Sequence, residues 1–182
     1  MIYTYKPKLT ILQQQILRLF FIKAGKSLNA RDIARALKVS PPAVAKALPL
    51  LEKENFLKIK KDKESKRWLI ELNRDSQRII WLKRADNFKQ IYESGLVQFF
   101  YDNFHSATII LFGSYAFGED TINSDVDIAI IGAKEKKVNL KNFEELLGRE
   151  IILNYYDSFK TIIKNLKENI LSGITLKGAI EL

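Results

Sequence analysis

The 182-residue sequence contains no cysteine and a single histidine, His105. Without cysteine the chain forms no disulfides and no thiolate metal sites, and one histidine excludes any site built from several histidines. No apolar run approaches the roughly 20 residues that a membrane helix needs. The N-terminal segment lacks the features of a signal or transit peptide. These absences favour a cytoplasmic protein without a membrane partner.

The charge of the chain is strongly asymmetric. The net charge is +9, yet residues 1–74 carry 17 Lys and Arg against 6 Asp and Glu, whereas residues 75–182 carry 13 against 15. The whole positive excess therefore lies in the first part of the chain. This pattern favours two domains, one of which faces a polyanion. A basic surface that only improves solubility is the alternative explanation.

Residues 1–74 predict three helices followed by a hairpin. Apolar residues recur at helical spacing near the start, Asn29 is a plausible cap for a short second helix, and Ser40 precedes a third helix over residues 41–56. Alternating apolar and polar residues over 56–72, interrupted by a charged tip, then predict a β-hairpin.

The stretch LNARDIARALKVSPPAVAKALPLLEKENFL resembles the winged helix-turn-helix domain of bacterial and archaeal regulators, over about residues 8–74. The resemblance implies that the 41–56 helix enters a DNA major groove and that the hairpin touches the backbone or minor groove. Contacts between basic side chains and phosphates would give affinity and salt dependence, but little sequence information. The expected DNA-binding residues are Lys46, Lys58, Lys60, Lys61, Lys63, Lys66 and Arg67. Winged helices that dock proteins or dimerise are the alternative, and a homodimer remains an open option.

Residues 75–104 predict a helical connector. Their apolar residues recur at helical spacing, and Gly95 is a candidate break between two helices. The connector is rich in aromatic residues, and their amphipathic spacing favours packing in a core over stacking on bases. His105, which follows, is expected to be structural or solvated.

The stretch IILFGSYAFGEDTINSDVDIAII, residues 109–131, carries the clearest chemical pattern. A buried strand ends at Gly113 and Ser114, and a second strand then places Asp125 and Asp127 on one face. A glycine lets the backbone approach a phosphate closely. Paired carboxylates suit Mg²⁺, which prefers oxygen ligands and keeps waters that phosphates replace. The sequence therefore predicts a site for a metal-bound nucleotide.

The motif LFGSYAFGEDTINSDVDIAI closely resembles the nucleotidyltransferase superfamily that includes DNA polymerase β, and within it the minimal nucleotidyltransferases. The resemblance extends from about Tyr92 to the C-terminus. It implies that Gly113 and Ser114 hold an NTP, with ATP expected, and that Asp125 and Asp127 ligate Mg²⁺. The implied reaction moves a nucleoside monophosphate to a hydroxyl of a nucleic acid, a small molecule or a partner-protein tyrosine. A small helical ribonuclease toxin is the protein partner that the resemblance implies.

Two positions depart from the pattern of that family. No arginine follows the Gly-Ser pair, and Ile152 stands where a third catalytic carboxylate is expected. Glu150, which shares strand parity with Ile152, is the candidate replacement, whereas Asp157 is expected to cap the final helix. The alternative function is therefore a DNA-binding transcriptional regulator or antitoxin whose transferase-like domain binds nucleotide but has little or no catalytic activity.

The predicted fold class is α+β with three parts. Residues 1–74 form a winged helix-turn-helix domain, and residues 75–104 form the helical connector. Residues 105–182 form a small mixed-sheet α/β nucleotidyltransferase domain.

Overall fold

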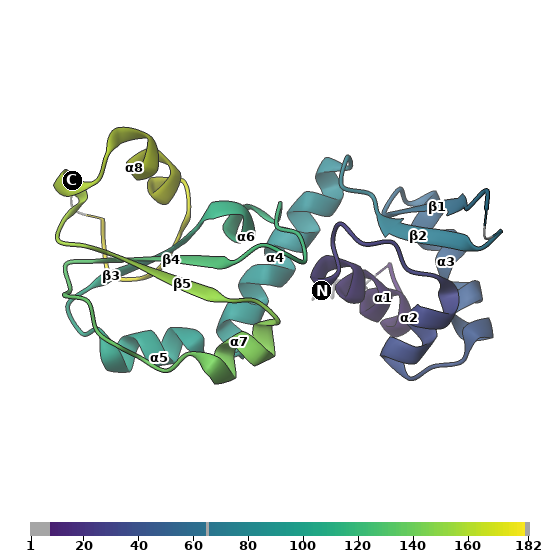
Figure 1. Cartoon of the computed structure of the whole chain (residues 1–182), viewed down its shortest axis with the longest axis horizontal. Helices are drawn as coiled ribbons and strands as arrows, with labels where there is room; N and C mark the ends of the chain where they lie inside the picture. The colour runs from purple at the N-terminus through teal and green to yellow at the C-terminus, as the bar shows by residue number, and fades with distance from the viewer. Residues whose placement is uncertain (1–7, 65, 181–182) are drawn as a thin grey trace, which may run out of the picture. The chain divides into compact units, whose positions relative to one another are not determined.

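The computed structural model describes residues 8–64 and 66–180, and the N-terminal segment without signal features, residues 1–7, lies outside this part. Contacts divide the chain into two compact units, Met1–Ile79 and Ile80–Leu182 (Figure 1). Within the described residues, none of the helices has the length and apolar character that a bilayer crossing requires.

The first unit contains three helices and a hairpin. These are α1 (Ile11–Ile22), α2 (Ala30–Leu37), α3 (Pro41–Lys53), β1 (Leu57–Lys61) and β2 (Trp68–Leu72). The two strands pair antiparallel. The predicted order of elements is confirmed. The third helix ends at Lys53, three residues earlier than expected.

Side-chain caps begin two of these helices where the sequence placed them. The Asn29 side chain accepts hydrogen bonds from the backbone N–H groups of Arg31 and Asp32. The Ser40 side chain accepts one from the N–H of Ala43. Each cap satisfies donors that the first turn of a helix leaves without an intrahelical partner.

The hairpin has one face toward the core of its unit and one face away from it. Leu57 and Ile70 are buried in that core with side chains from all three helices. Ile70 also forms a β-bridge with Leu28, through two backbone hydrogen bonds of 2.8 Å. Because side chains alternate along a strand, Lys58 and Lys60 lie on the opposite face.

The second unit is built on a mixed sheet. It begins within α4 (Gln77–Glu93), followed by α5 (Leu96–Asn103), β3 (Thr108–Phe112), α6 (Gly113–Phe117) and β4 (Val126–Ile131). Gly95 separates the two connector helices and caps the second.

The remaining elements are α7 (Lys141–Leu147), β5 (Ile151–Tyr156), the 3₁₀ turn η1 (Phe159–Thr161), α8 (Lys164–Leu171) and β6 (Ile174–Lys177). The strand order is β5-β4-β3-β6. β4 and β5 are parallel, whereas the other neighbours are antiparallel. The predicted α+β class with a small mixed sheet is confirmed.

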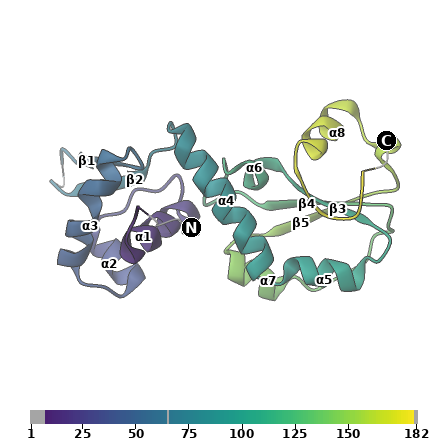
Figure 2. The same ribbon diagram turned by 180° about the vertical axis from the view of Figure 1, so that it is seen from behind.

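The sheet of the second unit is covered on both faces. Ile110, Ala129 and Ile131 pack with Ile170 of α8 on one face. Ile109, Leu111 and Val126 belong to a second cluster with residues of α4, α5 and α7. Figures 1 and 2 show α8 on one side of the sheet and α5 with α7 on the other. By strand alternation, Asp127 lies on the face of α8.

The prediction that Asp157 caps the final helix is wrong. Ser158 caps the 3₁₀ turn instead, because its side chain accepts a hydrogen bond from the N–H of Lys160. The chain then extends through Ile162 and Ile163 before α8 begins. The final helix is therefore shorter than its sequence pattern suggests.

Candidate functional site

A sharp corner joins β3 to α6 at Gly113. Its φ is +71°, in the left-handed region that glycine adopts at low cost. A Cβ at this position would lie 2.4 Å from Oδ2 of Asp127. The carboxylate of Asp127 therefore rests directly against the corner, in the space that any other residue would fill.

The two aspartates lie close enough to interact. Asp125 is exposed immediately before β4, and Asp127 is half-buried as its second residue. Burial raises the pKa of Asp127 above its usual 3.8, and the negative charge of Asp125 raises it further. Removal of water and like charge both disfavour ionisation, so the pair is suited to a cation. The structure places Asp127 against Gly113, and Asp125 acts on Asp127 through its charge.

Tyr156, at the end of β5, interacts electrostatically with the carboxylate of Asp127. Burial raises the pKa of Tyr156, and the charge of Asp127 raises it further. Tyr156 shares strand parity with Ile152, so both face the α8 side of the sheet with Asp127. Tyr156 pairs with Ile131, four residues along β4 from Asp127, and the sequence assigned no role to it.

A hydrocarbon side chain occupies the strand position beside Asp127. Asp127 pairs with Ile152 in the parallel register of β4 and β5. Glu150 lies one step earlier on the same face, and its carbonyl accepts a 2.8 Å hydrogen bond from the N–H of Val126. In the part of the chain that the structure describes, no three His, Cys, Asp or Glu side chains form a group that could hold a metal ion. The donor set fits one cation with two protein carboxylates, those of Asp125 and Asp127.

A cation approaches the α6 segment from another part of the chain. The segment after Ser114 lacks an arginine, but the guanidinium of Arg84 on α4 lies 5.6 Å from the centre of the Phe117 ring. Gly118 ends the helix and lies against the α4 backbone, where a Cβ would come within 2.5 Å of the carbonyl oxygen of Ile80. Sequence reasoning missed Arg84, because it is about 30 residues from the motif.

The basic residues of the hairpin have different surroundings. The ammonium of Lys58 lies 2.5 Å from a carboxylate oxygen of Asp75, and it lowers the pKa of that carboxyl through a hydrogen bond and its charge. Lys60 lies 3.9 Å from Glu71 on the same face. Lys61 lies over the ring of Trp68, 5.9 Å from its centre. Acidic neighbours thus partly neutralise one face of the hairpin.

Lys46, Lys63, Lys66 and Arg67, the other predicted contacts, are exposed. A cleft of about 440 Å³ separates the start of α2 from the start of β2. Its walls carry three arginines and an exposed indole that the sequence pattern did not single out as a group. The lining residues are Asn29, Ala30, Arg31, Asp32, Arg35, Arg67 and Trp68.

Comparisons with known protein families agree with the folds of both units. Residues 93–174 match the nucleotidyltransferase domain family, and residues 11–68 match the MarR family. The chain joins a MarR-type winged helix to a nucleotidyltransferase domain. The order of the two domains is the order that the sequence predicted. No curated protein matches the chain significantly.

Several solved structures of regulators resemble part of the chain. A mutant of MepR from S. aureus is 23% identical, with a TM-score of 0.37, over 42% of this chain and 56% of that one. A ZitR mutant from Lactococcus lactis is 23% identical, with a TM-score of 0.43, over 57% and 67%. A complex of S. aureus MepR with DNA is 25% identical, with a TM-score of 0.40, over 53% and 76%. The chain thus spans little more than half the length of the first of these proteins.

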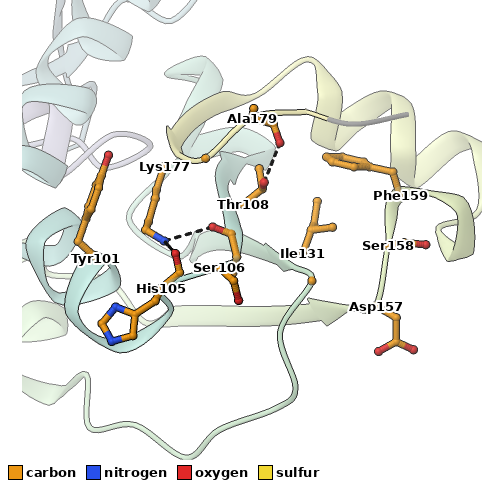
Figure 3. A pocket seen from close by; sticks show the side chains of 13 residues that line it. Tyr101, His105, Ser106, Thr108, Ile131, Asp157, Ser158, Phe159, Lys177 and Ala179 are labelled. Carbon is orange, nitrogen blue, oxygen red and sulfur yellow. Dashed lines mark hydrogen bonds between the residues drawn. The ribbon is translucent and has the colours of Figure 1, made fainter.

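A cavity of about 460 Å³ lies at the other end of the sheet of the nucleotidyltransferase domain (Figure 3). It is lined by the start of β3 and the end of β4, where Thr108 pairs with Ile131, whereas Asp127 pairs with Phe112. Lys177 projects there, but its ammonium donates to the carbonyls of Phe104, His105 and Ala107. This lysine therefore stabilises the chain after α5, and the cavity shares no lining residue with the Gly113 corner.

A buried polar network lies behind the corner of the nucleotidyltransferase domain. Asp120, in the loop between α6 and β4, is 1% exposed and forms salt bridges with Lys83 and Arg149. Asn87 donates a 2.7 Å hydrogen bond to the same carboxylate. The sequence gave no sign of this group, because its four members come from three separate segments.

Proposed function

We propose that the C-terminal unit transfers a nucleoside monophosphate from an NTP to an acceptor hydroxyl while the winged helix holds the protein on DNA. One observation carries the catalytic part. The carboxylate of Asp127 rests against the Cα of Gly113, and this contact supports a single site made by the glycine corner and the acidic pair. This arrangement suits a triphosphate whose charge is neutralised by a cation next to the carboxylates.

Each residue of the site has a distinct role in this proposal. The missing side chain of Gly113 leaves room for the carboxylate of Asp127 at the corner, and the backbone of Gly113 and the hydroxyl of Ser114 contact the phosphates. Asp125 and Asp127 hold a divalent cation, for which Mg²⁺ is the expected ion because all its ligands would be oxygens. When bound, the cation stabilises the negative charge that develops on the phosphates during transfer. Glu150, the weakest prediction, adds charge at the edge of the site.

The reaction needs no covalent intermediate with the protein. The oxygen of the acceptor hydroxyl forms a bond to the α-phosphorus, and the bond from that phosphorus to the bridging oxygen breaks. Pyrophosphate leaves and the hydroxyl proton passes to water. The protein contributes by holding the two reactants in line, which is the main source of catalysis in phosphoryl transfer.

Label transfer tests this activity. The protein is incubated with α-³²P-labelled NTPs, Mg²⁺ and candidate acceptors, beside the Asp125→Ala/Asp127→Ala variant. We expect the variant to lose transfer by about 100-fold or more, since both charged ligands are gone. Asp102→Ala/Glu135→Ala removes two exposed carboxylates elsewhere in the same unit and serves as the matched control. Equal transfer by the double variant of the site would refute the proposal.

The DNA-binding role rests on charge. The cleft between α2 and β2 adds Arg31 and Arg35 to the basic residues predicted in the hairpin. Trp68, which is 56% exposed, places a flat ring beside them. Guanidinium groups suit bidentate contacts with phosphate, and an exposed indole suits contact with a sugar or base. We therefore include Arg31, Arg35 and Trp68 in the proposed DNA-binding surface.

Salt dependence tests the DNA interface. The affinity for duplex DNA is measured at several salt concentrations for the wild type and for Lys61→Ala/Lys63→Ala/Lys66→Ala. Each phosphate contact that is lost should reduce the slope of log K against log salt by about 0.9. Lys89→Ala is the control, because Lys89 is an exposed lysine of the second unit that pairs with Glu93. Unchanged slopes, or no DNA affinity at all, would favour a winged helix that docks proteins.

A second function is favoured by one observation. Ile152 fills the strand position beside Asp127 with hydrocarbon, so a catalytic carboxylate is absent there. A DNA-binding regulator that senses nucleotide through the same corner would bind NTP with Mg²⁺ and transfer nothing. The label-transfer assay, run beside a nucleotide-binding assay, separates the two functions. The helical toxin partner and the identity of the acceptor remain predictions.

A further inference from the structure

The buried carboxylate of Asp120 connects three segments of the candidate site: α6, the loop before β4, and the start of β5. Its Oδ1 accepts hydrogen bonds from Lys83 and Asn87, which lie one turn apart on α4. Its Oδ2 accepts a 3.3 Å hydrogen bond from Nη2 of Arg149. We call Lys83, Asn87, Asp120 and Arg149 the Asp120 network. Every member is at most 6% exposed, so no member reaches the solvent side of the site.

The network extends to the Gly-Ser corner through Asn87. Besides the bond to Asp120, Nδ2 of Asn87 donates a 2.9 Å hydrogen bond to the carbonyl oxygen of Tyr115. Tyr115 follows Ser114 directly in α6, and the N–H of Glu119 donates to the carbonyl of Ser114. The same amide group therefore fixes α6 and the loop that leads to β4.

The network extends to β5 through Arg149. This residue precedes Glu150, whose carbonyl accepts the hydrogen bond from the N–H of Val126. Arg149 also donates a 3.0 Å hydrogen bond to the carbonyl of Gly148. Asp120 thus ties the start of β5 to the loop that ends at Asp125.

The loop has little freedom to move away from α4. A Cβ at Gly118 would lie 2.5 Å from the carbonyl oxygen of Ile80 and 2.6 Å from the backbone nitrogen of Arg84. This contact and the Asp120 network hold the two ends of the segment Gly118–Asp120 on the same helix. Two cations contact one buried carboxylate, so removal of its charge weakens the ion pairs that join the loop to Lys83 and Arg149.

We propose that Asp120 is a positioning residue that holds the Gly113–Ser114 corner and the Asp125–Asp127 pair at the spacing that a metal-bound nucleotide needs. The inference rests on the proposed nucleotide function. Asp120 itself does not touch the nucleotide. It acts through α6, through the loop before β4, and through the start of β5.

The test compares ATP affinity with and without Mg²⁺. In the wild type, Mg²⁺ should tighten ATP binding, and Asp125→Ala/Asp127→Ala should abolish this gain. Asp120→Asn should reduce the gain by about 10- to 100-fold, the usual cost of losing a residue that orients metal ligands. Lys177→Met is the matched control, because it removes another buried ionic group of the same unit far from the corner.

A merely structural role predicts a different result. Asp120→Asn would then lower the melting temperature, as is expected for Lys177→Met, while the folded protein would keep the full Mg²⁺-dependent gain in ATP affinity. That outcome would overturn the inference and leave the proposed function intact. If Asp120→Asn does not fold, Asn87→Leu replaces it, since this change breaks the link to Tyr115 and keeps the charged groups.

If the wild type shows no gain from Mg²⁺, the proposed function fails, and the role of Asp120 toward a metal-bound nucleotide fails with it. Hydrogen exchange then tests separately whether Asp120 holds the three segments together. Under the inference, Asp120→Asn or Asn87→Leu speeds amide exchange together in residues 114–116, 119–125 and 149–151. Lys177→Met should leave these segments protected. Faster exchange spread evenly over the unit, or confined to one segment, would refute the positioning role.

Discussion

Replacement of Gly113 by alanine is the most direct test of the corner. The backbone there has a φ of +71°, and an L-residue in this region costs about 1 kcal/mol. The new Cβ would lie 2.4 Å from Oδ2 of Asp127, whereas an ordinary contact needs about 3.4 Å. The carboxylate must therefore swing by about 1 Å, which costs about 0.5–1.5 kcal/mol if it leaves its rotamer. A shift of about 1 Å in a group that positions the reactants reduces the rate of nucleotide transfer by about 100-fold.

Gly132→Ala is the matched control for this prediction. Gly132 has a φ of +83°, and a Cβ there would meet no atom within 4 Å. Gly132→Ala should therefore lose only the backbone cost of about 1 kcal/mol in the free energy of unfolding. For a domain of this size, this loss lowers the melting temperature by about 4–8 °C. Gly113→Ala should lose a little more stability and most of the Mg²⁺-dependent ATP binding and transfer. Thermal melts and the ATP assays measure both effects.

The Asp127→Ala background separates the two costs. Without the carboxylate, Gly113→Ala should cost no more stability than Gly132→Ala, because only the backbone term remains. A coupling of about 0.5–1.5 kcal/mol between Gly113 and Asp127 is the expected result of the double-mutant cycle. If Gly113→Ala keeps wild-type ATP binding with Mg²⁺, the carboxylate does not act from the corner and the reasoning is wrong.

Three further predictions concern single residues. Burial and the charge of Asp125 raise the pKa of Asp127, so its ionisation costs stability as the pH rises from about 3.8 through the raised value. Asp127→Asn should therefore melt higher than the wild type at pH 7, and pH-dependent melts should show the gap closing below 3.8. Ile152→Asp should increase nucleotide transfer by about tenfold or more, because one preorganised charged group commonly contributes a factor of about 10²–10³ to the rate. Ile152→Asn is the control, and no increase in a folded Ile152→Asp variant would contradict the importance of a third carboxylate. Lys177→Met should lower the melting temperature, since it removes the hydrogen bonds of the ammonium to the carbonyls of Phe104, His105 and Ala107, at about 1–3 kcal/mol, while ATP affinity stays unchanged.

Local sequence signals predicted most elements of both units. Asn29 and Ser40 begin helices because their side chains satisfy backbone donors within three residues, and this chemistry is readable without the fold. The alternation in the hairpin and the Gly113 corner are equally local. The prediction of a helix cap at Asp157 was wrong because Ser158, one residue later, can cap a turn equally well. Only the path of the chain after β5 decides which of the two residues acts as the cap.

The sequence alone determined that Gly-Ser follows one strand, that two aspartates one residue apart stand at the start of the next strand, and that the positive charge belongs to the first part of the chain. These follow from residue type and from the two-residue period of a strand. Only the tertiary structure decided that Ile152 lies beside Asp127, that Arg84 approaches Phe117, and that Asp120 joins α4 to the start of β5. These relations depend on strand pairing and helix packing between residues far apart in the chain, and no spacing within the motif encodes them.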